Sequence, residues 1–120
     1  MAGEIRHTTK LQLSSGNLQT DFNPAAGVID QAAAVLYDSV HDVGTVEESI
    51  TSFGDVATEG RAIIHNLDAT NFVQIGFATT VYGIRLPAGE WADFRLEPGA
   101  SLFLKSNTAA CNVRILVLAN

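Results

Sequence analysis

The sequence predicts an all-β fold, an antiparallel β-sandwich or barrel of about eight short strands in a single domain over residues 1–120. Turn signals recur at short, fairly even intervals, and the segments between them are rich in β-branched and aromatic residues. Several segments also alternate between apolar and polar residues, which is the period of a half-buried strand. Strands at this spacing are typical of sandwiches and barrels, and 120 residues suffice for one core.

Glycine, proline, asparagine and aspartate mark the expected turns, at 14–17, 23–24, 53–55, 59–60, 66–71, 86–89 and 97–99. Pro98-Gly99 suits a type II turn, because proline presets the first central φ and glycine accepts the positive φ of the second. Pro87, with Gly89 two positions later, suits a type I turn. Both turns would join antiparallel neighbours.

The second half of the chain gives the clearest strands, expected at 61–65, 72–77, 80–86, 91–96, 101–105 and 113–118. Alternation assigns these side chains to the core: Ala92, Phe94, Leu96, Leu102, Leu104, Val113, Ile115 and Val117. Leu116 and Leu118 make the last strand apolar on both sides. Its end is therefore expected to be buried on both faces or to meet a partner.

The first half is less regular. Residues 5–13 alternate as one amphipathic strand, with Ile5 and Leu13 on the apolar face. Residues 24–36 are read as a loop or short helix followed by a strand, because Asn23-Pro24 could begin a helix that Gly27 weakens. From 34 to 53 we expect two strands or one long bent strand, with Gly44 near the bend.

Composition and charge favour a chain that binds other proteins. Hydrophobic residues make up 47% of the chain and charged residues 17%, so the surface carries an unusual share of uncharged area, which a protein partner would cover. The formal charge is −6, and no cluster of lysine or arginine occurs. Direct binding to nucleic acid is therefore not expected.

Nothing in the sequence indicates a membrane or an oxidising compartment. The first ten residues are polar and charged, and no apolar run reaches the roughly 18–20 residues that span a bilayer. The lone Cys111 cannot form an internal disulfide, and its apolar neighbours favour a buried, inert thiol. We expect folding in a cytoplasm, without export or membrane insertion.

No constellation of residues predicts an enzyme, a metal site or a bound cofactor. His7, His41 and His65 are scattered; we expect His7 and His65 to be hydrogen-bonded, partly buried strand residues and His41 to be solvated. Glu47 and Glu48 are adjacent, so on a strand they point to opposite faces and form no catalytic pair. Nucleophile elbows, phosphate-binding loops and calcium loops are absent from the sequence.

Some large side chains fall on the side of their strands opposite to the predicted core. Trp91 and Arg95 lie there on one strand, and Phe103 with Lys105 on the next. Aromatic residues and arginine are enriched at protein contacts, so an interface is favoured over core filling or sugar stacking. The predicted interface residues are Trp91, Phe103, Arg95, Leu116 and Leu118.

Two stretches carry a family resemblance. Residues 60–76 contain an N-x-D-x-T-N turn between strands, and residues 86–96 contain L-P-A-G-E followed by F-R-L. With this cadence, the stretch from Glu47 to Leu118 resembles small virion proteins of tailed bacteriophages. It is similar to capsid decoration, or cement, proteins, which have jelly-roll-like folds.

The resemblance implies a non-enzymatic virion structural protein with a jelly-roll-like sandwich. It would bind the outer surface of the major capsid protein shell as a small homo-oligomer, a dimer or trimer, and stabilise that shell against packaged DNA. The virion capsid surface would be its location, after assembly in the host cytoplasm. A terminal strand, residues 5–13 or the last one, would contact a neighbour. The alternatives are a tail, neck or baseplate component of the same viruses, or a carbohydrate-binding or receptor-binding module.

Overall fold

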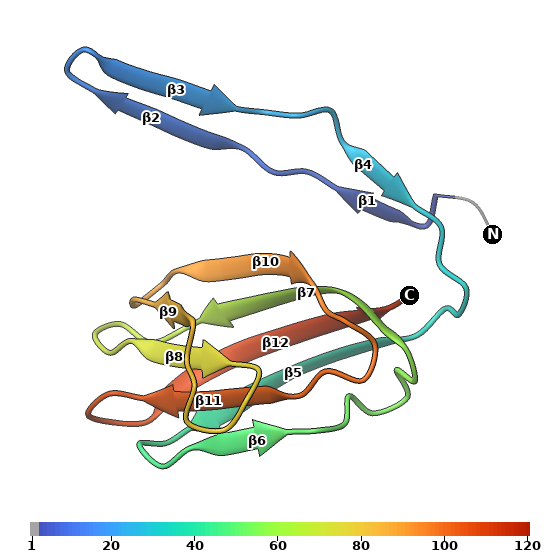
Figure 1. Ribbon diagram of the computed structural model, residues 1–120, viewed down its shortest axis with the longest axis vertical. Helices are drawn as coiled ribbons and strands as arrows, with labels where there is room; N and C mark the ends of the chain where they lie inside the picture. Colours follow the sequence, from blue (N-terminus) through green and yellow to red (C-terminus); the bar gives the residue numbers. More distant parts are fainter. Residues whose placement is uncertain (1–2) are drawn as a thin grey trace. The chain divides into compact units, whose positions relative to one another are not determined.

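The computed structural model describes residues 3–120, and within that range the chain is all-β, with twelve strands, no helix and antiparallel pairing throughout (Figure 1). The chain divides into two compact units, Met1–Ala33 and Ala34–Asn120. Each unit is described by itself.

The first unit contains four strands in two antiparallel pairs, β1 (Ile5–His7) with β4 (Gly27–Ile29) and β2 (Leu11–Ser15) with β3 (Leu18–Phe22). A two-residue turn, Gly16-Asn17, joins β2 to β3, and Gly16 has a φ of 56°. A glycine with positive φ at the first central position is the requirement of a type II′ hairpin turn, which matches the twist of the flanking strands.

The second unit contains eight strands: β5 (Leu36–Val43), β6 (Glu48–Ile50), β7 (Glu59–Asn66), β8 (Val73–Gly76), β9 (Ile84–Leu86), β10 (Trp91–Arg95), β11 (Leu102–Ser106) and β12 (Cys111–Ala119). They form two four-stranded sheets with the orders β10-β7-β12-β5 and β6-β11-β8-β9. Figure 1 shows the two sheets as separate layers of this unit.

Strand pairing in the second unit is nested. The first strand pairs with the last, β5 with β12, and the next pairs inward are β6 with β11, β7 with β10 and β8 with β9. The pairs β7–β12 and β8–β11 then complete the two sheets. Most contacts therefore join residues far apart in sequence.

One hydrophobic cluster draws on both four-stranded sheets. The members with no measurable exposure are Val43, Phe53, Ile64, Val73, Ile75, Leu102, Leu104, Cys111, Val113, Ile115 and Val117. The alternate residues of β7, β11 and β12 supply much of this cluster, as expected for strands with one face in the core. The predicted core residues of the last two strands are confirmed.

The predicted all-β, antiparallel class is confirmed, but the expected count of about eight strands is wrong, because residues 3–120 form twelve. The first unit supplies the additional four. Residues 5–13 are not one strand but β1 and β2, separated at 8–10, and residues 24–36 contain β4 without any helix. The helix that Asn23-Pro24 could begin does not form, because the residues that would continue it include β4, which pairs with β1.

Three smaller predictions concern glycines. Gly44 lies between β5 and β6, as expected for two strands with a bend. Gly99 has a φ of 84° and Ala100 N–H donates to Glu97 O at 2.9 Å, which confirms the type II turn. The type I turn at Pro87 is wrong, since Gly89 is its third residue and has a φ of 80°.

Candidate interaction surfaces

The outer side of the sheet β10-β7-β12-β5 carries most of the predicted interface residues. Directly paired residues share a face of a sheet, so the strand register defines which side chains lie there. We call this surface the Trp91 face; its members are Trp91, Asp93, Arg95, Arg61, Ile63, His65, Asn112, Arg114, Leu116, Leu118, Leu36, Asp38, Val40 and Asp42.

Four of the five predicted interface residues meet on the Trp91 face: Trp91, Arg95, Leu116 and Leu118. Trp91 is 65% exposed, whereas Leu116 and Leu118 are half-buried. Phe103 lies elsewhere, on β11 of the other sheet, opposite to the buried Leu102 and Leu104. That any of them contacts a partner protein stays a prediction.

Charged side chains on the Trp91 face pair with one another. Arg114 donates two hydrogen bonds to Asp38, from Nε at 2.9 Å and from Nη2 at 2.8 Å, and this contact holds the pKa of the Asp38 carboxyl below its usual value. Arg61 donates to Asp93 at 2.9 Å. Three arginines and three aspartates make the face formally neutral, although the whole chain carries −6.

A hollow of about 270 Å³ opens on this face. It is lined by Ile63, His65, Trp91, Arg114 and Leu116. The His65 ring stands edge-on to the Trp91 indole, with 5.7 Å between the ring centroids, and its Nε2 lies 3.1 Å from Gly89 O. A carbonyl oxygen only accepts, so Nε2 carries the proton of this hydrogen bond. The His65 ring, held by this hydrogen bond, packs against the indole.

The outer side of the sheet β6-β11-β8-β9 is more basic. Gln74 of β8 pairs with Lys105 of β11 on one side and with Arg85 of β9 on the other. The Arg85 guanidinium lies 4.1 Å from the Phe72 ring centroid, a cation–π contact. Phe103 belongs to this surface, on a different sheet from Trp91.

In the first unit, β2 and β3 form a two-stranded ribbon with one apolar side. Leu11 pairs with Phe22, Leu13 with Thr20, and Ser15 with Leu18, so these six share a side. Its four large hydrophobic side chains are all exposed, Leu11 at 67% and Phe22 at 57%. We call Leu11, Leu13, Leu18 and Phe22 the apolar ribbon face. The opposite side bears Gln12, Ser14, Gln19 and Asp21.

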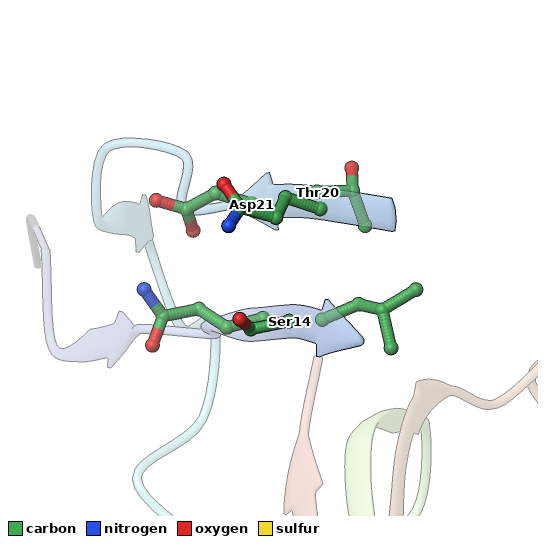
Figure 2. Close-up of a pocket in the computed structure, with 6 residues that line it drawn as sticks. Ser14, Thr20 and Asp21 are labelled. Atoms are coloured by element: carbon green, nitrogen blue, oxygen red, sulfur yellow. The ribbon is translucent and has the colours of Figure 1, made fainter. Parts of the chain in front are cut away.

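A hollow of about 500 Å³ lies against this ribbon, and Figure 2 shows the side chains that line it. They are Gln12, Leu13, Ser14, Gln19, Thr20 and Asp21. The register places Leu13 and Thr20 on the opposite side of the ribbon from the other four, and all six are exposed. Side chains that diverge to both sides of a ribbon enclose no ligand, so we assign no small-molecule site there.

Glu47 clamps the loop that follows β8. Its carboxylate accepts hydrogen bonds from Thr79 Oγ1 at 2.6 Å, Thr80 N–H at 2.7 Å and Tyr82 OH at 2.5 Å. These hydrogen bonds lower the pKa of Glu47, with the Thr79 hydroxyl contributing most, followed by the Tyr82 hydroxyl and the Thr80 amide. The hydrogen bond to Glu47 in turn raises the pKa of Tyr82 to about 12. Thr80 has a positive φ of 58°, so the clamp holds a conformation that non-glycine residues rarely adopt.

The buried Asn66 organises the N-x-D-x-T-N turn. Its amide nitrogen donates to Asn71 O at 2.9 Å and Leu86 O at 3.0 Å, and its Oδ1 accepts from Asp68 N–H at 3.0 Å. Asp68 Oδ2 in turn accepts from the backbone N–H groups of Thr70 and Asn71. Hydrogen bonds within the turn, together with the one from Asn66 to Leu86 O, thus give the motif a structural explanation.

The histidines and Cys111 are placed partly as predicted. His7 and His65 are half-buried and hydrogen-bonded, which confirms that expectation. The expected solvation of His41 is wrong: its side chain is 20% exposed, and its Nε2 lies 2.6 Å from Tyr37 OH. The Cys111 side chain is buried as predicted, and burial raises the pKa of its thiol.

Within residues 3–120, no group of three or more histidine, cysteine, aspartate or glutamate side chains is arranged to hold a metal ion. The same part of the chain contains no helix long and apolar enough to cross a membrane. Comparison with protein-family models, with curated proteins and with solved structures found no match to this chain.

Sequence reasoning missed the hollow and the ribbon. The hollow needs Ile63, His65 and Arg114 beside Trp91, and three strands must be placed in register before these residues meet. The ribbon had a local signal: Leu11 and Leu13 alternate before the Gly16-Asn17 turn, and a second apolar alternation follows it.

Proposed function

We propose that residues 34–120 form a β-sandwich of the jelly-roll type. The nested pairs, first strand with last and so inward, are what results when one long antiparallel hairpin of eight strands is rolled into two sheets. The single hydrophobic cluster shared by both four-stranded sheets supports two facing layers. Jelly rolls occur in viral capsid proteins and also in lectins.

We propose further that the protein is a non-enzymatic capsid decoration, or cement, subunit that binds the outer surface of a major capsid protein shell. The apolar ribbon face carries this proposal. A two-stranded ribbon is marginally stable in water, and this one exposes four large hydrophobic side chains with no charge among them. Such a surface gains stability when another protein covers it.

The charge of the chain supports an external position on the shell. A net charge of −6 disfavours contact with the packaged genome. On an icosahedral shell, many identical copies would repeat a modest ribbon contact, and such repetition strengthens attachment without any new contact per copy. The shell would be stabilised because each bound copy bridges neighbouring capsid subunits.

Co-sedimentation with shells that lack this protein tests the proposal. Leu13→Asp places a charge on the apolar ribbon face, whereas Ser14→Asp places the same charge on the opposite side of the same strand. We expect Leu13→Asp to lose shell binding and Ser14→Asp to bind as the unmodified chain does. Equal binding by both variants would show that the ribbon face is not the attachment site.

The stabilising role has its own readout. Shells that carry the protein should resist heating and osmotic shock better than stripped shells, and adding the purified chain back should restore that resistance. Shells whose resistance does not depend on the protein would exclude a cement role. A tail, neck or baseplate role would appear as binding to tails instead of shells.

A carbohydrate-binding role remains the second candidate, because the exposed Trp91 indole lies beside the polar groups of His65 and Arg114. A glycan array probed with the unmodified chain and with Trp91→Ala tests it. Glycan binding that Trp91→Ala abolishes would support this role, and no binding by the unmodified chain would remove it.

A further inference from the structure

We infer that the Trp91 face is the contact surface between two copies of this chain in a symmetric dimer. This inference goes beyond the decoration role and does not rest on it. It places the contact on the outer side of the sheet β10-β7-β12-β5, in the second unit alone.

The balance of charge points to a second copy as the occupant. Two subunits of net charge −6 repel each other unless they meet where their charges cancel. The Trp91 face has three arginines and three aspartates, so the whole excess of acidic residues lies elsewhere. The pairs Arg114–Asp38 and Arg61–Asp93 are already formed within one chain. The face therefore requires no oppositely charged foreign partner.

The shape of the face is complementary to itself. Trp91 is 65% exposed and lines the hollow together with Ile63 and Leu116. In a twofold-symmetric contact, every contact occurs twice: if one residue of the first copy meets another residue of the second, the same two residues also meet with the copies exchanged. The indole of each copy can therefore enter the hollow of the other. A buried aromatic anchor in a partner's pocket is the usual centre of a protein interface.

The size of the hollow and of the face agree with this assignment. At about 270 Å³, the hollow lies just below the roughly 300–1,000 Å³ range of small-molecule sites, which suits a single side chain. Four strands about 4.8 Å apart, the longest about 27 Å, span roughly 500 Å² in projection. Because side chains project from the sheet, the accessible area of the face is larger than its projection and approaches the roughly 600–800 Å² that each partner of a small stable interface buries.

The sequence supplies its own probe, because Trp91 is the only tryptophan. Sedimentation of the full chain over a dilution series measures its mass, and tryptophan emission of the same samples reports the environment of Trp91. We expect a dimer that dissociates on dilution. Its emission should shift to longer wavelength, and acrylamide quenching should rise several-fold, in parallel with dissociation.

Charge-matched variants test the location of the contact. Arg114→Glu unbalances the Trp91 face, whereas Arg85→Glu makes the same change in charge on the outer side of the other sheet. Both side chains are exposed, so both variants should unfold cooperatively at similar temperatures. We expect Arg114→Glu to be monomeric at concentrations where Arg85→Glu and the unmodified chain are dimers. Trp91→Ala should also be monomeric.

A chain that is monomeric at every concentration would overturn the inference. So would a dimer that Arg114→Glu leaves intact, or a dimer whose Trp91 emission does not change on dissociation. These measurements use the purified chain without shells, so their failure leaves the shell-binding test with Leu13→Asp and Ser14→Asp unaffected. Conversely, lack of shell binding would leave the dimer result in place.

Discussion

Glu47 and Asn66 show how single polar side chains fix the loops of this fold. Each makes three hydrogen bonds, and each reaches a segment at least 20 residues away in sequence, Glu47 at Tyr82 and Asn66 at Leu86. Backbone N–H and C=O groups in loops have no neighbouring strand to hydrogen-bond, so side chains such as these supply the missing hydrogen bonds.

The Glu47 clamp makes a spectroscopic prediction. Ultraviolet titration of the phenol should show one tyrosine with a pKa of about 12, and Tyr82→Phe should remove that step. Because the folded pKa lies above the ordinary value of about 10, the contact stabilises the fold fully below pH ~10 and loses this effect as the pH rises towards 12. Glu47→Gln should lower the Tyr82 pKa. An unchanged titration in Glu47→Gln would contradict the clamp.

In acid, the stability that the same clamp contributes has the opposite pH dependence. The pKa of Glu47 is lowered, so its stabilising effect is present above the ordinary value of about 4.3 and is lost as the pH falls through the folded pKa. Glu47→Gln should therefore lower the thermal unfolding midpoint at neutral pH and have less effect in acid. An equal effect at both pH values would show that the charge of Glu47 is not involved.

Gly76, the last residue of β8, and Gly83, in the loop between β8 and β9, form a matched pair. A Cβ on Gly76 would lie 1.7 Å from Val81 O, whereas nothing lies within 4 Å of one on Gly83. Backbone cannot move as a side chain can, so Gly76→Ala should destabilise the fold by about 3 kcal/mol or more. Gly83→Ala should be close to neutral. Denaturant unfolding of both variants measures this, and similar midpoints would contradict the predicted backbone clash.

At the scale of the elements, strands of the second unit differ sharply from those of the ribbon. Ile115 on β12 is fully buried between neighbouring strands β5 and β7, whereas Leu13 on β2 is exposed. Ile115→Ala should cost about 2–5 kcal/mol of unfolding free energy, and Leu13→Ala should cost little in the isolated chain. Chemical denaturation compares them. Equal costs would mean that the apolar ribbon face is covered in solution.

The elements also show what sequence could predict. Alternation identified β10, β11 and β12, because a half-buried strand writes its period into the chain. It joined β1 and β2 into one strand, because residues 5–13 alternate throughout while backbone pairing stops at 8–10. The register between strands depends on segments far apart in the sequence, so the neighbours of Trp91 in the hollow could not be predicted from local patterns.

For the whole molecule, the two units differ in what holds them together. The hydrophobic cluster is drawn entirely from the second unit, between Val43 and Ala119. A chain without residues 1–33 should therefore still unfold in one cooperative transition, with stability close to that of the full chain. Loss of cooperative unfolding would favour the single domain over residues 1–120 predicted from chain length.

The function could be predicted least from the sequence pattern, because strands at an interface and strands in a core show the same alternation of apolar and polar residues. The resemblance to phage decoration proteins implies the major capsid protein as a partner, which stays a prediction. The structure contributes two exposed surfaces, the apolar ribbon face and the mixed apolar and charge-balanced Trp91 face. We propose that the ribbon attaches the protein to the shell and that the Trp91 face joins two copies.

Electron cryomicroscopy of purified phage particles, with the chain added or expressed in them, tests the proposed decoration role without intermediate steps. We expect density for residues 34–120 on the outer surface of the capsid, with the ribbon β2–β3 seated on the major capsid protein. Density for the chain in the tail, the neck or the baseplate, or inside the shell, would contradict it.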